Sequence, residues 1–148
     1  MTTLARLIAF LLSLAVVACS VLPWVETANA WDLPLRSLVS PARTTGSSMV
    51  ASIGLGLAIA AAILLLGSLV NSRALVILGG LVTVALPSIW ILSNAVARST
   101  GVPLNLIQVG AYGSVVMGFV ALVLAAVATD TRLPSARRPR RADDRSAP

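Results

Sequence analysis

The chain has 148 residues, of which 57% are hydrophobic and only 11% charged, and its mean hydropathy is +0.95. Soluble domains average about 25% charged residues, so this chain lacks the polar side chains that would cover a water-soluble globule. The composition therefore excludes a soluble enzyme and indicates an integral membrane protein.

All eleven basic residues are arginines, histidine is absent, and five acidic residues leave a net charge of +6. Six of the arginines lie after Asp130, close to the C-terminus. The single cysteine, Cys19, cannot form a disulfide within the chain, so cysteine usage does not indicate the redox compartment.

Four apolar stretches are each long enough to cross about 30 Å of hydrocarbon as a helix. They lack the two-residue alternation of barrel strands, and backbone groups in lipid must be paired internally. We expect an all-α, four-helix transmembrane bundle over residues 1–129, with spans at about 5–25, 48–70, 74–95 and 107–129.

The distribution of arginines predicts the orientation of these spans. With the N-terminus inside, eight of the eleven arginines lie on the inner side, as cytoplasmic segments usually show. Four aromatic residues near the expected outer boundary, Trp24, Trp31, Trp90 and Tyr112, agree with this arrangement, because Trp and Tyr favour membrane interfaces. We expect a multi-pass protein of a bacterial cytoplasmic membrane with both termini in the cytoplasm.

Residues 1–30 have three interpretations. The apolar run after Arg6 fits a retained helix, because it is longer than the usual core of a signal peptide. Ala28-Asn29-Ala30 also matches a signal-peptidase site, and Val16 to Cys19 loosely matches the pattern before a lipid-modified cysteine. The sequence favours the retained helix and leaves the other two open.

The centres of the predicted spans contain no titratable side chain. Ionisable residues at membrane depth usually mark proton relays and ion paths, and a small proton-coupled exporter needs a carboxylate there. Without histidine, neither a Ser–His pair nor an H-E-x-x-H zinc site can form. We therefore expect a non-catalytic protein with no cofactor and no metal.

Small residues repeat every four positions in two spans. Gly110, Ser114 and Gly118 share one helix face in span four, and Ser52, Gly56 and Ala60 do so in span two. Such faces let another helix backbone approach closely. They predict either packing within the bundle or the docking of a partner subunit or second copy.

The segment Trp31 to Val39 carries a helix-start pattern, with Asp32 as the candidate N-cap and Pro34 in the first turn. Leu35, Leu38 and Val39 would then share one face. We expect a short outer amphipathic helix that either lies on the membrane surface or caps the bundle.

The tail, residues 130–148, is rich in arginine and proline and is predicted to be disordered. Four of its arginines are candidates for binding anionic lipid headgroups: Arg137, Arg138, Arg140 and Arg141. The same cluster could instead serve only to fix the topology. Nothing in it indicates nucleic-acid recognition, so no nucleic-acid partner is expected.

Three features, Leu22-Pro23-Trp24, Asn71-Ser72-Arg73 and the arginine tail, occur in a four-span arrangement. The chain resembles the small, uncharacterised four-span membrane proteins of GC-rich bacteria, a resemblance that implies location rather than activity. We expect an accessory or scaffold subunit of a membrane complex, with a membrane-protein partner or a homo-oligomer. The alternative is a self-associating transporter or pore, including a holin-like protein.

Overall fold

The computed structural model describes residues 3–26, 28–39, 49–97 and 106–128. Most of these residues form four α-helices, which are joined by a small two-stranded sheet and short 3₁₀ turns. The helices are α1 (Thr3–Val21), α2 (Ile53–Leu69), α3 (Arg73–Val96) and α4 (Val109–Val127). The sheet pairs β1 (Pro23–Val25) with β2 (Ala28–Asn29), and the 3₁₀ turns are η1 (Leu35–Leu38) and η2 (Met49–Ala51).

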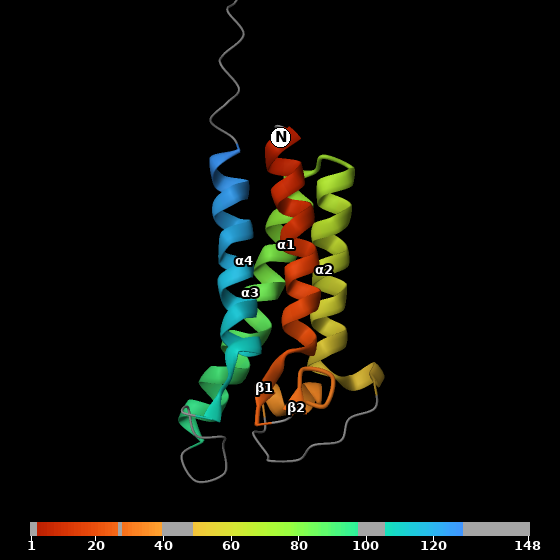
Figure 1. Ribbon diagram of the computed structural model, residues 1–148. Coiled ribbons are helices and arrows are strands. Elements are labelled where there is room, and N and C mark those ends of the chain that lie inside the picture. The colour runs from red at the N-terminus through yellow and green to blue at the C-terminus, as the bar shows by residue number, and fades with distance from the viewer. Residues whose placement is uncertain (1–2, 27, 40–48, 98–105, 129–148) are drawn as a thin grey trace, which may run out of the picture.

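The four helices form one bundle (Figure 1). α1 packs against α2 and α4, and α3 packs against the same two helices from the other side. The start of α1, the α2–α3 turn and the end of α4 lie at one end, which we call the turn end. The β1–β2 sheet and η1 lie at the other, which we call the hairpin end.

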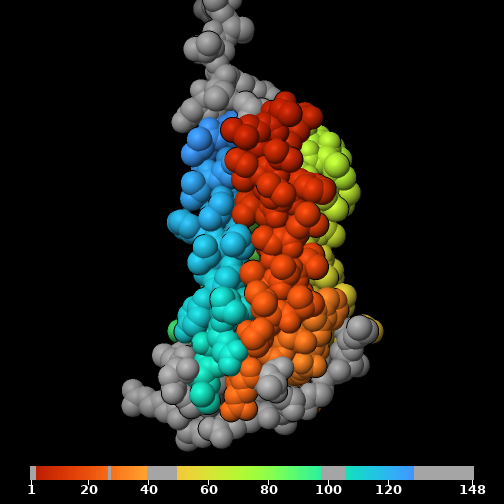
Figure 2. Space-filling view, in the orientation of Figure 1, coloured from red at the N-terminus to blue at the C-terminus, as the bar shows by residue number. Residues whose placement is uncertain are grey.

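Three of the helices, α1, α3 and α4, are long and apolar enough to cross a membrane. α2 is equally apolar but has 17 residues. Large hydrophobic side chains are exposed along all four helices, an arrangement that suits lipid rather than water. α1 lies uncovered along one face of the bundle (Figure 2).

The first helix ends at Val21, short of the predicted limit at residue 25. Pro23 disfavours a helical conformation for the residue before it, and the chain then turns into β1. β1 pairs antiparallel with β2, and Val25 also forms a bridge with Ile107, just before α4. The small sheet therefore joins the end of α1 to the start of α4, which the all-α prediction did not include.

The connection between α2 and α3 is as short as the sequence predicts. Asn71 adopts a left-handed conformation with φ of 59°, which asparagine tolerates better than most residues. Its side-chain oxygen accepts a hydrogen bond from Arg6 Nε at 3.1 Å. The tight turn is thereby linked to the first helix at the turn end.

Candidate functional site at the hairpin end

The segment after β2 folds over the hairpin end of the bundle. Leu33 O accepts a hydrogen bond from Ile53 N at 2.9 Å, and Pro34 forms a bridge with Ser52. Leu33 and Ser37 are buried. Of the two expectations for this segment, the contacts fit the cap over the bundle.

The predicted start of this segment is wrong. Asp32 is not an N-cap, because its carboxylate accepts a hydrogen bond from Asn29 N at 3.1 Å within the preceding turn. The 3₁₀ turn η1 begins after Pro34, without a side-chain cap. The three-residue repeat of a 3₁₀ turn also separates the predicted apolar face, since Leu38 packs against the core while Val39 is 88% exposed.

Two tryptophans fill the interior of the hairpin end. The rings of Trp24 and Trp90 lie 5.7 Å apart at an angle of 59°, a tilted geometry that aromatic pairs favour. Trp24 Nε1 donates a hydrogen bond to Cys19 O at 3.0 Å. Both side chains are buried, so they pack inside the protein rather than on its surface.

Trp31 lies at the edge of the same region and connects α1 to α2. Its Nε1 donates a hydrogen bond to Ser20 Oγ at 3.3 Å. A methyl group at Gly54 would lie 2.5 Å from Trp31 Cδ2, so the ring fits against α2 only because Gly54 has no side chain. Tyr112, by contrast, is 46% exposed.

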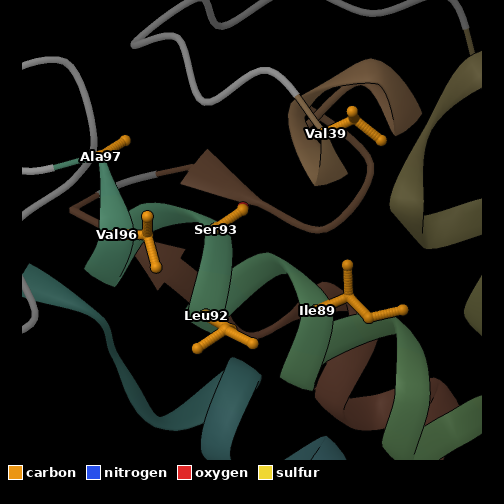
Figure 3. A pocket seen from close by; sticks show the side chains of 6 residues that line it. All are labelled: Val39, Ile89, Leu92, Ser93, Val96 and Ala97. Carbon is orange, nitrogen blue, oxygen red and sulfur yellow. The ribbon is translucent and has the colours of Figure 1, made fainter.

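An open groove lies between η1 and the last two turns of α3 (Figure 3). Its volume is about 440 Å³, and five of its six lining residues are apolar: Val39, Ile89, Leu92, Ser93, Val96 and Ala97. Ser93 Oγ donates to Trp90 O at 2.9 Å and contacts Ser37 O at 3.4 Å. The serine thereby brings η1 into contact with α3 at the groove.

The predicted small-residue face of α4 lies inside the bundle. Gly110, Ser114 and Gly118 are all buried. A methyl group at Gly118 would lie 2.8 Å from Val84 Cγ2 and 2.9 Å from Val84 N, so α3 and α4 are in backbone contact there. In this structure the face serves packing between the protein's own helices.

The predicted residues of span two occupy three different environments. Ala60 is fully buried, and Gly56 is half-buried against Leu86 of α3. Ser52 precedes the helix as its N-cap, and its Oγ accepts a hydrogen bond from Leu55 N at 3.2 Å. Spacing alone placed Ser52 on a helix face, but it belongs to the cap.

Buried polar side chains in the described helices bond to nearby carbonyls of their own helix. Thr83 Oγ1 donates to Gly79 O at 2.7 Å, Asn94 Nδ2 to Trp90 O at 2.9 Å and Ser114 Oγ to Gly110 O at 2.9 Å. Across the described residues, no buried side-chain nitrogen or oxygen lacks a hydrogen-bond partner. In that same part of the chain, no group of three His, Cys, Asp or Glu side chains could hold a metal ion.

The candidate headgroup ligands Arg137, Arg138, Arg140 and Arg141 lie outside the described residues. The groove, conversely, was not predicted. Its two walls are separated by about fifty residues in the sequence, and no local pattern indicates that they meet.

Comparisons with protein-family models, curated proteins and solved structures find no match to this chain.

Proposed function

We propose that the chain is a four-span protein of a bacterial cytoplasmic membrane with both termini in the cytoplasm. The apolar surfaces of all four helices support this location. For α2, the turn Met49–Ala51 and the cap Ser52 extend a helix of 17 residues toward the length that a crossing requires. The arginine distribution assigns the turn end, with Arg6 and Arg73, to the cytoplasmic side.

Within this membrane, we propose a non-catalytic role as an accessory or scaffold subunit of a larger complex. The observation that carries the proposal is the chemistry of the bundle interior. The charged residues within the described helices are Arg6 and Arg73, both at the turn end, and the buried hydroxyl and amide groups are already hydrogen-bonded. Such an interior offers no acid, base or nucleophile poised for a reaction.

The tail arginines would add contacts with anionic headgroups at the cytoplasmic surface, where each basic residue contributes about 1 kcal/mol. Arg6 and Arg73 lie at the same end of the bundle. A partner would contact a surface other than the small-residue face of α4, since that face is already packed against α3. The exposed side chains at the hairpin end, including Leu35 and Val50 of η2, are available for such a contact.

Site-specific photo-crosslinking in native membranes tests the scaffold role. A photoreactive amino acid at Leu35 or Val50 is expected to capture a defined membrane protein, identified after purification in mild detergent. The same group at Leu57, which is fully buried, is the matched control and should capture none. A chain that stays monomeric and forms no crosslink from either exposed position would contradict the proposal.

The exposed face of α1 favours the alternative, a self-associating transporter or pore. Leu4, Leu7, Leu11 and Leu14 are each more than half exposed and alternate in steps of three and four residues, the spacing of a coiled-coil seam. The charged residue of this stretch, Arg6, is hydrogen-bonded to Asn71 at the turn end and does not belong to the leucine seam. Regular homo-oligomers with ion leakage from vesicles would support this alternative, and their loss after Leu7→Ala with Leu11→Ala, but not after Phe10→Ala, would assign the seam.

A further inference from the structure

The groove between η1 and α3 has an apolar floor, and η1, on one side of it, carries Arg36. Its exposed apolar side chains include Leu92, 64% exposed, and Val96, 72% exposed. Ile89 and Ser93 lie on the α3 side and Val39 on the η1 side of the space between them (Figure 3). Among the described lining residues, the one polar side chain is Ser93, whose Oγ is engaged with Trp90 O and Ser37 O, so the groove suits a hydrocarbon chain.

Arg36 belongs to η1 and precedes Val39, the C-cap of that turn, by three residues. This is the spacing at which side chains of a 3₁₀ turn come into line. Val39 N donates a hydrogen bond to Arg36 O at 3.2 Å, which holds the two residues in this register. The Arg36 side chain is exposed and forms no ion pair with any described residue.

No carboxylate lies among the described residues that line the groove. The acidic residue of this segment, Asp32, lies in the turn before η1, where its carboxylate accepts a hydrogen bond from Asn29 N at 3.1 Å. An apolar groove beside a guanidinium complements an amphiphile with an anionic head.

In a membrane crossed by α3, the groove would lie near the level of the lipid headgroups. Its 24 residues span about 36 Å, which exceeds the roughly 30 Å thickness of the hydrocarbon core. Ile89 to Ala97 occupy the final part of this length. A phosphate at Arg36 would therefore lie near the water boundary, while an acyl chain would run along Val96, Leu92 and Ile89 into the hydrocarbon.

We propose that this groove is a binding site for one anionic phospholipid, with its phosphate at Arg36 and an acyl chain between Val39 and α3. The proposal rests on the membrane location proposed above. Under that topology, the lipid belongs to the outer leaflet.

The test uses the full chain in vesicles of mixed phosphatidylglycerol and phosphatidylcholine. Each lipid in turn carries a photoreactive group in its acyl chain, while the other is unlabelled. Fragmentation mass spectrometry then locates the adducts along α3 and η1. We expect phosphatidylglycerol to label Val39 and Leu92 to Val96 in preference to phosphatidylcholine. Arg36→Gln should reduce this preference about fivefold, as for the loss of one basic residue near an anionic surface.

Two matched pairs separate the site from general contact with lipid. Arg73→Gln removes a cation from the start of α3 and should leave the preference at the groove unchanged. Leu92→Trp should abolish groove adducts of both lipids by filling the space, whereas Leu81→Trp, at an exposed position of α3 outside the groove, should not. Retained tryptophan fluorescence and helix content show that the variants fold.

Equal labelling of the groove by both lipids, or a preference that Arg36→Gln leaves intact, would overturn the proposal. Adducts at Leu81 but none at the groove would also overturn it, because lipid would then reach α3 without entering the groove. A lack of adducts along the whole of α3 would instead overturn the membrane location.

Discussion

The indole ring of Trp24 lies directly against Gly110. A methyl group on Gly110 would sit 2.5 Å from Trp24 Cδ1 and 2.8 Å from Pro23 O. This contact explains how a strand residue after α1 reaches the interior at the start of α4. Gln108 N also donates to Trp24 O at 2.8 Å, so the backbone and the ring of Trp24 are both held by this region.

Gly110→Ala is therefore expected to destabilise the bundle by about 1–3 kcal/mol, the usual effect of overpacking a well-filled interior. The loss follows from the backbone oxygen of Pro23, which cannot move aside as a flexible side chain can. Thermal unfolding in detergent, monitored through the fluorescence of the buried tryptophans, measures this loss of stability. Gly113→Ala is the control, because a methyl group there meets a single side-chain atom, Cys19 Sγ, at 3.0 Å. Equal losses of stability in Gly110→Ala and Gly113→Ala would contradict the conclusion that the backbone of Pro23 limits the space at Gly110.

Gly118→Ala separates packing within the bundle from docking of a partner. A methyl group would press on the side chain and the backbone of Val84, so we expect a loss of about 1–3 kcal/mol that does not depend on protein concentration. Phe119→Ala, at an exposed position of the same helix, should change stability little. If Gly118→Ala instead left unfolding unchanged and weakened association, the face would belong to a partner interface.

The sequence predicted the helices best where polar residues bound them. α3, Arg73–Val96, lies within a residue of the expected span because the Asn71-Ser72-Arg73 turn precedes it. α1 was extended too far because Pro23, Trp24 and Val25 are as apolar as the helix before them. Their strand is set by pairing with β2 and Ile107, contacts that no local pattern encodes.

In the candidate sites, too, local sequence patterns predict the features of a single helix but not the contacts between elements. Four-residue spacing correctly grouped Gly110, Ser114 and Gly118 on one buried face, because helix geometry alone determines that grouping. The neighbour that fills the face, Val84 of α3, depends on how the helices pack. The groove depends on tertiary structure still more, since it exists only where η1 meets α3.

Ser52 and Ser72 form a natural pair for testing the cap of α2. Both precede a helix, but only the Ser52 side chain accepts a hydrogen bond from a helix N–H, that of Leu55. We expect Ser52→Ala to cost about 0.5–2 kcal/mol, as for other N-caps, and Ser72→Ala to cost much less. Parallel thermal unfolding of the two variants measures the difference. A larger effect from Ser72→Ala would show that the cap of α2 contributes little.

The final prediction concerns residues 1–30, which we expect the membrane-inserted protein to retain. Ala30 is fully buried, its N–H donates to Ser20 O at 3.2 Å and its carbonyl accepts from Gly54 N at 2.8 Å. The bond that a signal peptidase would cut, between Ala30 and Trp31, is thus held between α1 and α2. Cleavage there would also remove the helix that packs against α2 and α4.

Intact mass spectrometry of the protein isolated from membranes measures this directly. A chain retaining the first helix has a mass close to 15.2 kDa. Ala28→Leu, which spoils the small-residue pattern of the cleavage site, should give the same mass apart from the substitution itself. A native chain that begins at Trp31, together with a longer one from Ala28→Leu, would show that α1 is a leader. The remaining three helices would then have to pack without it.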